Sequence, residues 1–147
     1  MTARVAAIEP PFAPELQAIF ARMMPLGVPP LTLFTMLASD RRLFDRFRKS
    51  GFLDKGHLTL HQREIVIDRT TALSGSEYEW GVHIAFFADR ADLNEAQRHS
   101  LVRGTGDDSC WPPEDRVLLQ ACDQLHATCD LDDVLWGEMR RVEVAPL

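Results

Sequence analysis

Apolar residues recur at helical spacing along nearly the whole chain, whereas the alternation of apolar and polar residues that is typical of strands is almost absent. This pattern predicts an all-α fold, a compact bundle of six or seven helices. The expected helices cover about 14–24, 31–49, 59–73, 76–89, 95–103, 113–128 and 131–141. The terminal run VEVAP alternates, but it is too short to predict a strand.

Residues that begin and end helices stand between these segments. Thr59 and Gln62 have the spacing of a capping box, in which each side chain bonds the backbone N–H of the other residue. Asn94 is a typical N-cap for the helix that follows it. Gly75 ends the helix that starts after Thr59, and the next helix begins at Ser76. We therefore expect these two helices to fold back on each other as a hairpin.

Length and composition fit one domain over residues 1–147 of an ordinary globular protein, with 46% hydrophobic and 26% charged residues. The net charge of -6 argues against nucleic-acid binding, because phosphate backbones repel acidic chains. No segment approaches the roughly 18 apolar residues of a membrane span. The N-terminus lacks a signal-peptide pattern, and Cys110, Cys122 and Cys129 form no Cys-x-x-Cys motif. We expect reduced thiols and a cytoplasmic location.

Three polar residues interrupt the apolar stretch SGSEYEWGVHIAFF at helical spacing. At about 100° per residue, Glu79 and His83 lie about 60° and 20° to the same side of Ser76, so all three share one face. The preceding helix carries Glu64 and Asp68, four residues apart, and Glu64 can face His83 across the hairpin. The same pattern has a structural interpretation, since Ser76-x-x-Glu79 is also the spacing of a capping box.

An imidazole beside carboxylates in an apolar stretch is typical of general acid–base catalysis, although a lone buried histidine is more often a satisfied core group. Metal binding is a weaker alternative. Its ligands would be His61, Glu64, Glu79 and His83, but they match no recognised ligand motif. We expect no metal and no cofactor.

The stretch LTLHQREIVIDRTTALSGSEYEWGVHIAF resembles the carboxymuconolactone decarboxylase and alkylhydroperoxidase D superfamily. The resemblance extends over about 30–103 and is sharpest between Leu60 and Phe87. It implies an all-helical fold, assembly into dimers, trimers or hexamers, and a pocket near the subunit contact. In the alkylhydroperoxidase branch, a Glu, a Cys-x-x-Cys pair and a His form a proton relay that serves a redox dithiol. The relay Glu and His correspond to Glu64 and His83, and the cysteine positions are occupied by other residues.

The two cysteine positions fall on Ser76 and Glu79, so the chain resembles a subgroup without the dithiol. The leading hypothesis is a proton-transfer enzyme that decarboxylates or isomerises a small organic acid or lactone. Its expected catalytic residues are His83 as general acid or base, Glu64 as its orienting partner, Glu79 as a second proton carrier, and Ser76 as a hydrogen-bond donor or cap. The expected substrate-binding residues are Tyr78, Arg63 and Arg69.

Two alternatives stay open at this point. The first is a non-catalytic, oligomeric helical module that keeps the fold. The second is a peroxiredoxin-like antioxidant, which is disfavoured because Ser76 and Glu79 cannot form a disulfide and the three cysteines are widely spaced. The end of the chain, GEMRRVEVAPL, replaces the further apolar helices of the resembling subgroup, which predicts a truncated or diverged C-terminus.

Overall fold

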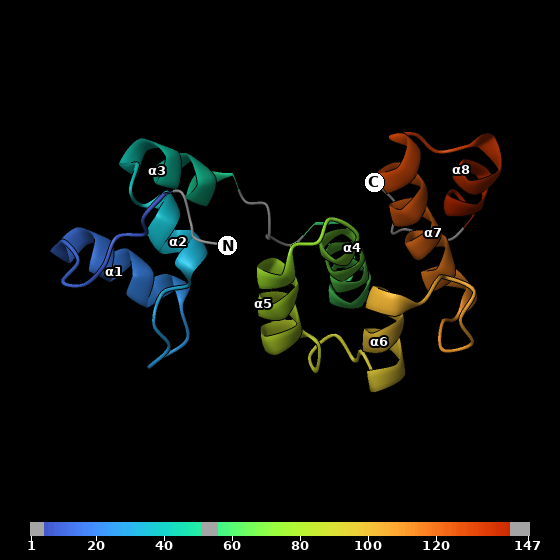
Figure 1. The fold of residues 1–147 in the computed structure, drawn as a ribbon, viewed down its shortest axis with the longest axis horizontal. Helices are drawn as coiled ribbons and strands as arrows, with labels where there is room; N and C mark the ends of the chain where they lie inside the picture. The colour runs from blue at the N-terminus through green and yellow to red at the C-terminus, as the bar shows by residue number, and fades with distance from the viewer. Residues whose placement is uncertain (1–4, 51–55, 142–147) are drawn as a thin grey trace. The chain divides into compact units, whose positions relative to one another are not determined.

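The computed structural model describes residues 5–50 and 56–141, and in these ranges all regular structure is α-helical (Figure 1). The predicted all-α fold is thereby confirmed. The chain forms two compact units, Met1–Asp54 and Lys55–Leu147. The single domain expected over 1–147 stays a prediction. The terminal run VEVAP and the expected C-terminal divergence beyond residue 141 lie outside the described residues.

The first unit contains α1 (Pro14–Met23), α2 (Thr32–Leu37) and α3 (Arg41–Lys49). Pro14 occupies the first turn of α1, where its missing N–H costs no hydrogen bond. Aromatic rings make much of the core, with the ring centroids of Phe20 and Phe44 5.7 Å apart. The buried core residues are Leu16, Ile19, Phe20, Ala38 and Phe44.

The single helix expected over 31–49 is wrong, because the segment divides into α2 and α3. Ser39 Oγ donates to the carbonyl of Met36 at the end of α2. The Asp40 side chain then accepts from Leu43 N at 3.1 Å and starts a new helix. An N-cap residue adopts an extended backbone, so the continuous apolar stripe does not keep the helix continuous. This division raises the helix count in the described ranges to eight, above the six or seven predicted.

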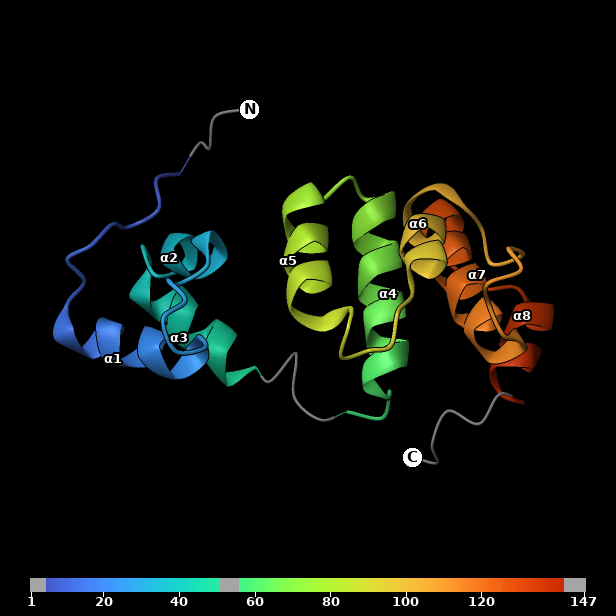
Figure 2. The ribbon, with the colours of Figure 1, turned by 90° about the horizontal axis from the view of Figure 1, so that it is seen from below.

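The second unit contains α4 (Leu60–Leu73), α5 (Glu77–Phe87), α6 (Glu95–Arg103), α7 (Pro113–Thr128) and α8 (Asp133–Met139). Helix α4 packs against α5, α6 and α7, and α8 packs against α7. Figure 2 shows α4 between α5 on one side and α6 and α7 on the other. None of the helices in the described ranges combines the length and the apolar character that a membrane crossing requires.

The core of this unit lies mainly on the side of α4 that faces α6 and α7. Its buried residues are Ile65, Ala88, Ala91, Leu93, Leu101, Trp111, Leu118 and Leu119. By contrast, His83 is the buried residue of α5, and the aromatic side chains of that helix are partly exposed. The α4–α5 contact therefore contains a buried polar residue, His83, next to partly exposed aromatic side chains.

The turn between α4 and α5 sets the register of the hairpin. Gly75 has a φ of +67°, which glycine adopts without a steric penalty, and Ser76 N donates to the carbonyl of Thr71 at 2.8 Å. At the other end of α4, the predicted capping box of Thr59 and Gln62 is present. The same motif at Ser76 and Glu79 is absent, because the Ser76 side chain makes no capping hydrogen bond. The capping interpretation of Ser76 is therefore wrong.

Candidate functional site

The hairpin brings Glu64 and His83 together, as the helical spacing predicts. His83 Nδ1 lies 2.7 Å from Glu64 Oε2, and the two residues are 7% and 0% exposed. A carboxylate accepts hydrogen bonds, so Nδ1 carries a proton and donates a hydrogen bond to Glu64 Oε2. The neutral ring then has its lone pair on Nε2, which makes no hydrogen bond within the described residues. This is the nitrogen through which the ring can exchange a proton with another molecule.

A cation holds the second oxygen of Glu64. Arg63 Nε and Nη2 lie 3.1 and 3.0 Å from Glu64 Oε1, so Glu64 accepts three charge-assisted hydrogen bonds from described residues. The guanidinium of Arg63 also lies over the ring of Phe87, 5.6 Å from its centroid, and this ring is 5.5 Å from that of His83. Arg63, an expected substrate-binding residue, thus forms an ion pair with Glu64, and its role in binding stays a prediction.

A second buried acid, Asp68, lies one turn further along the same face of α4. It is 0% exposed, and neither carboxyl oxygen has a hydrogen-bond partner in the described part of the chain. Burial, and then the nearby charge of Glu64, raise the pKa of Asp68 to about 7, although His83 and Arg98 act in the opposite direction. Sequence reasoning placed Asp68 beside Glu64 but did not include it among the site residues. The signal was its four-residue spacing from Glu64.

The remaining expected site residues of α5 lie on the same hairpin with fewer contacts. Ser76 and Glu79 are half-buried, and Glu79 forms no ion pair within the described part of the chain. Tyr78 is 46% exposed. Next to Glu79, the indole Nε1 of Trp80 is buried without a hydrogen-bond partner, which sequence reasoning did not anticipate. Within the described ranges, the buried side-chain nitrogen and oxygen atoms without partners are those of Asp68 on α4 and Trp80 on α5.

Arg69, the other expected substrate-binding residue, contacts different helices. Its guanidinium bonds both carboxyl oxygens of Asp123 on α7, at 2.6 and 3.0 Å, and the carbonyl of Leu101 on α6, at 2.9 Å. Arg69 is 6% exposed. The structure does not bring it to Glu64 and His83, and its role there is to join α4 to α6 and α7.

His61 forms a second histidine–carboxylate pair, which the sequence did not reveal. Its Nδ1 lies 2.6 Å from the carbonyl of Ala91, and its Nε2 lies 2.9 Å from Asp115 Oδ2 on α7. Both partners accept hydrogen bonds, so the imidazolium form satisfies both. Burial lowers the pKa of His61, but the hydrogen bonds to Ala91 and Asp115 outweigh it, so the net shift is upward.

The proposed metal ligands do not assemble. His61 bonds groups outside the α4–α5 pair, whereas His83 bonds Glu64. Over residues 5–50 and 56–141, the His, Cys, Asp and Glu side chains form no group of three or more that could hold a metal ion.

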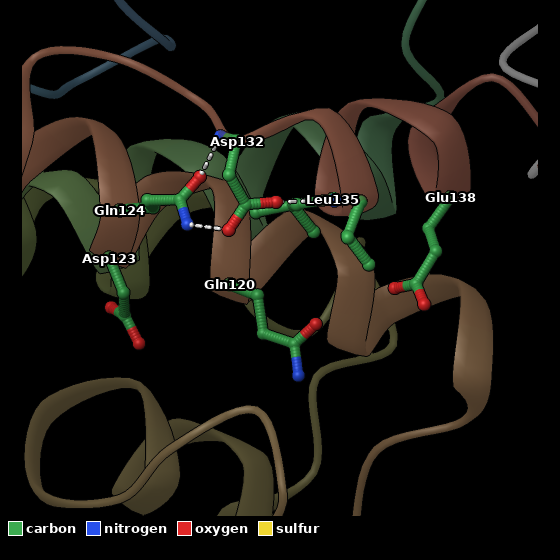
Figure 3. Close-up of a pocket in the computed structure, with 7 residues that line it drawn as sticks. Gln120, Asp123, Gln124, Asp132, Leu135 and Glu138 are labelled. Atoms are coloured by element: carbon green, nitrogen blue, oxygen red, sulfur yellow. Dashed lines mark hydrogen bonds between the residues drawn. The ribbon is translucent and has the colours of Figure 1, made fainter.

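Two hollows on the second unit lie away from His83. The first, of about 500 Å³, lies between α7 and α8 and is shown in Figure 3. Its polar groups bond one another: Gln124 Nε2 donates to Asp132 Oδ2 at 2.7 Å, and Asp132 N donates to Gln124 Oε1 at 2.7 Å. The second, of about 730 Å³, is lined by the start of α6 and the loop that contains Cys110. Neither hollow is lined by Glu64 or His83.

No family model, no curated protein and no solved structure matches this chain. The arguments for function therefore come from the geometry of the α4–α5 hairpin.

Proposed function

We propose that the α4–α5 hairpin is the active site of a proton-transfer enzyme that acts on a small organic acid or lactone. The observation that carries the proposal is the buried hydrogen bond of 2.7 Å between His83 Nδ1 and Glu64 Oε2. A carboxylate on Nδ1 fixes the tautomer and leaves Nε2 as the base, which general acid–base catalysis requires. The resemblance to the carboxymuconolactone decarboxylase and alkylhydroperoxidase D superfamily supports the same pair of residues.

The positive charge of Arg63 makes the site compatible with an acidic substrate. Two adjacent buried carboxylates would repel an organic anion, but Arg63 balances the charge of Glu64 through two hydrogen bonds. Asp68 is partly neutral around pH 7, because its pKa is raised to about 7. The cluster around His83 therefore carries little net negative charge.

Exchange of a C–H hydrogen of a small compound for deuterium tests the reaction class directly. The protein is incubated in D2O with a panel of small keto acids and lactones, and the loss of the C–H signal next to the carbonyl is followed by proton NMR. We expect exchange with at least one compound, and a loss of about 100-fold or more in His83→Gln, because a general base contributes about this much. Glu64→Gln should lose activity to a smaller extent, since Nε2 stays in place but its tautomer is no longer fixed.

His126→Gln is the matched control, because His126 is an exposed histidine on α7. It should exchange at the rate of the unchanged protein. Equal rates in the unchanged protein and in His83→Gln, for every compound of the panel, would overturn the proposal.

One observation favours a second candidate, a helical module without catalysis. The two hollows described above lie at α6, α7 and α8, and neither is lined by His83. In that case Glu64→Gln would lower stability, and no compound of the panel would exchange.

Self-association belongs to the proposal as well. The resemblance implies dimers to hexamers, and the half-exposed aromatic side chains of α5, with Tyr78 46% exposed, support an interface on that helix. Light scattering coupled to gel filtration measures the mass. We expect a mass of at least two chains, and a monomer would remove this part of the proposal.

A further inference from the structure

The two buried acids of α4 differ in the hydrogen bonds that they receive. Glu64 and Asp68 share one face of the helix, and both are 0% exposed. Glu64 accepts two hydrogen bonds from Arg63 and one from His83, whereas Asp68 accepts none. A buried carboxylate without donors is costly to ionise, while one with several charge-assisted donors is stabilised as the anion.

The charged groups on the helices packed against α4 do not offset this difference. From α5, the group that acts on Asp68 is His83, whose proton faces Glu64. From α6 it is Arg98, whose guanidinium bonds the carbonyl of Leu93 and the carboxylate of Asp89. Neither of these groups bonds Asp68.

On the α7 side of α4, the charged groups are paired with one another. Asp123 bonds Arg69, and Asp115 bonds His61. Two carboxyl groups in one buried site repel each other when both are ionised, so such a pair holds one proton over a range of pH. The donors decide which of the two acids keeps it.

We propose that Asp68 holds this proton and acts as a positioning residue for the Glu64–His83 pair. The inference rests on the proposed function for its catalytic meaning. While Asp68 is neutral, the negative charge that bonds His83 is that of Glu64, and Nε2 of the neutral ring is available as a base. When Asp68 releases its proton to solvent, a second negative charge appears one turn from Glu64. This charge stabilises the imidazolium form of His83, which has no lone pair to accept a proton.

The first measurement is the carbon-13 resonance of the Asp68 carboxyl group between pH 4 and pH 9, assigned by its absence in Asp68→Asn. We expect its midpoint near pH 7, where burial and Glu64 place its pKa. In Glu64→Gln the midpoint should move to lower pH, because the repelling charge is gone. A signal that stays at the position of an ionised carboxylate over the whole range would overturn the inference.

The second measurement separates coupling from a purely structural role. The nitrogen-15 shifts of the His83 ring should show an inflection at the pH where Asp68 titrates, and Asp68→Asn should abolish it. Asp133→Asn, at an exposed acid in the first turn of α8, is the matched control and should retain it. A His83 ring that ignores the titration of Asp68 would also overturn the inference.

The two proposals fail separately. Absence of the His83 inflection in the unchanged protein speaks against the role of Asp68, whereas absence of deuterium exchange in the unchanged protein speaks against the enzyme. Coupling between the two residues is measurable in a protein that turns over no substrate.

Discussion

The buried polar groups on two sides of α4 differ in how completely they are hydrogen-bonded. Toward α6 and α7, Arg69 bonds Asp123 and the carbonyl of Leu101, and both ring nitrogens of His61 have partners. On the face of α4 that carries Glu64, the carboxyl group of Asp68 is buried without a partner among the described residues. The side with complete hydrogen bonding adjoins the main apolar core, and the incomplete side contains the Glu64–His83 pair.

The difference helps to distinguish buried polar groups that stabilise the fold from those that have another role. Buried polar groups in folded proteins are nearly always hydrogen-bonded, so a paired group such as Arg69 needs no further explanation than stability. An unpaired carboxyl group lowers stability, and a protein keeps it where some other property depends on it. The location of Asp68 beside Glu64 therefore adds to the argument from the Glu64–His83 hydrogen bond.

The largest effect is expected at Asp68, in the pH dependence of stability. Its pKa is raised in the folded protein to about 7, so the folded state binds its proton more tightly than the unfolded chain does. The free energy of unfolding should therefore fall as pH rises from about 4 to about 7, by on the order of 3 kcal/mol. Asp68→Asn should remove this decline. Urea unfolding at pH 4 and pH 8 measures the difference, and an equal decline in both proteins would contradict the comparison.

A smaller loss of stability is expected when the hydrogen bonds of Arg69 toward α6 and α7 are removed. Arg69→Met leaves Asp123 and the Leu101 carbonyl without a partner, and it should lower the free energy of unfolding by about 2 kcal/mol. Arg48→Met, which removes an exposed ion pair with Asp45, is the control and should cost less than about 1 kcal/mol. The nitrogen-15 shifts of His83 should not change in Arg69→Met. A changed tautomer would show that the two sides of α4 are coupled.

The smallest effect is expected at His61. Its pKa is raised by the hydrogen bonds to Ala91 and Asp115, so its stabilisation is present below the unfolded value of about 6.5 and is lost as pH rises through the folded value. His61→Gln should cost about 1 kcal/mol at pH 6 and less at pH 9. Thermal unfolding at the two pH values measures the loss of stability in His61→Gln. A loss that grows with pH would contradict the upward shift in the pKa of His61.

Helical periodicity was sufficient to place Glu64 opposite His83, because a tight turn at Gly75 fixes the register of two neighbouring helices. The same periodicity also separates Asp68 from Arg69. At about 100° per residue, Asp68 lies about 40° from Glu64 on α4, whereas Arg69 lies about 140° away and faces other helices. Asp68 was therefore the better site candidate on sequence grounds alone.

Other contacts could not be predicted from the sequence. The spacing of Ser76 and Glu79 is that of a capping box, but whether the side chains bond depends on the backbone at the cap, where Ser76 has φ −87° and ψ 74°. Likewise, the pairing of His61 with Asp115 joins residues 54 positions apart and depends on how α7 packs on α4.

The sequence by itself determined the all-α class, the capping box at Thr59 and the turn at Gly75, because all of these depend on residues close along the chain. Only the tertiary structure decided which buried groups are satisfied. Hydrogen-bond donors reach Glu64, Arg69 finds its acceptors on α6 and α7, and Asp68 is left without a donor. Burial and distance between helices set these outcomes, and neither is a property of the local sequence.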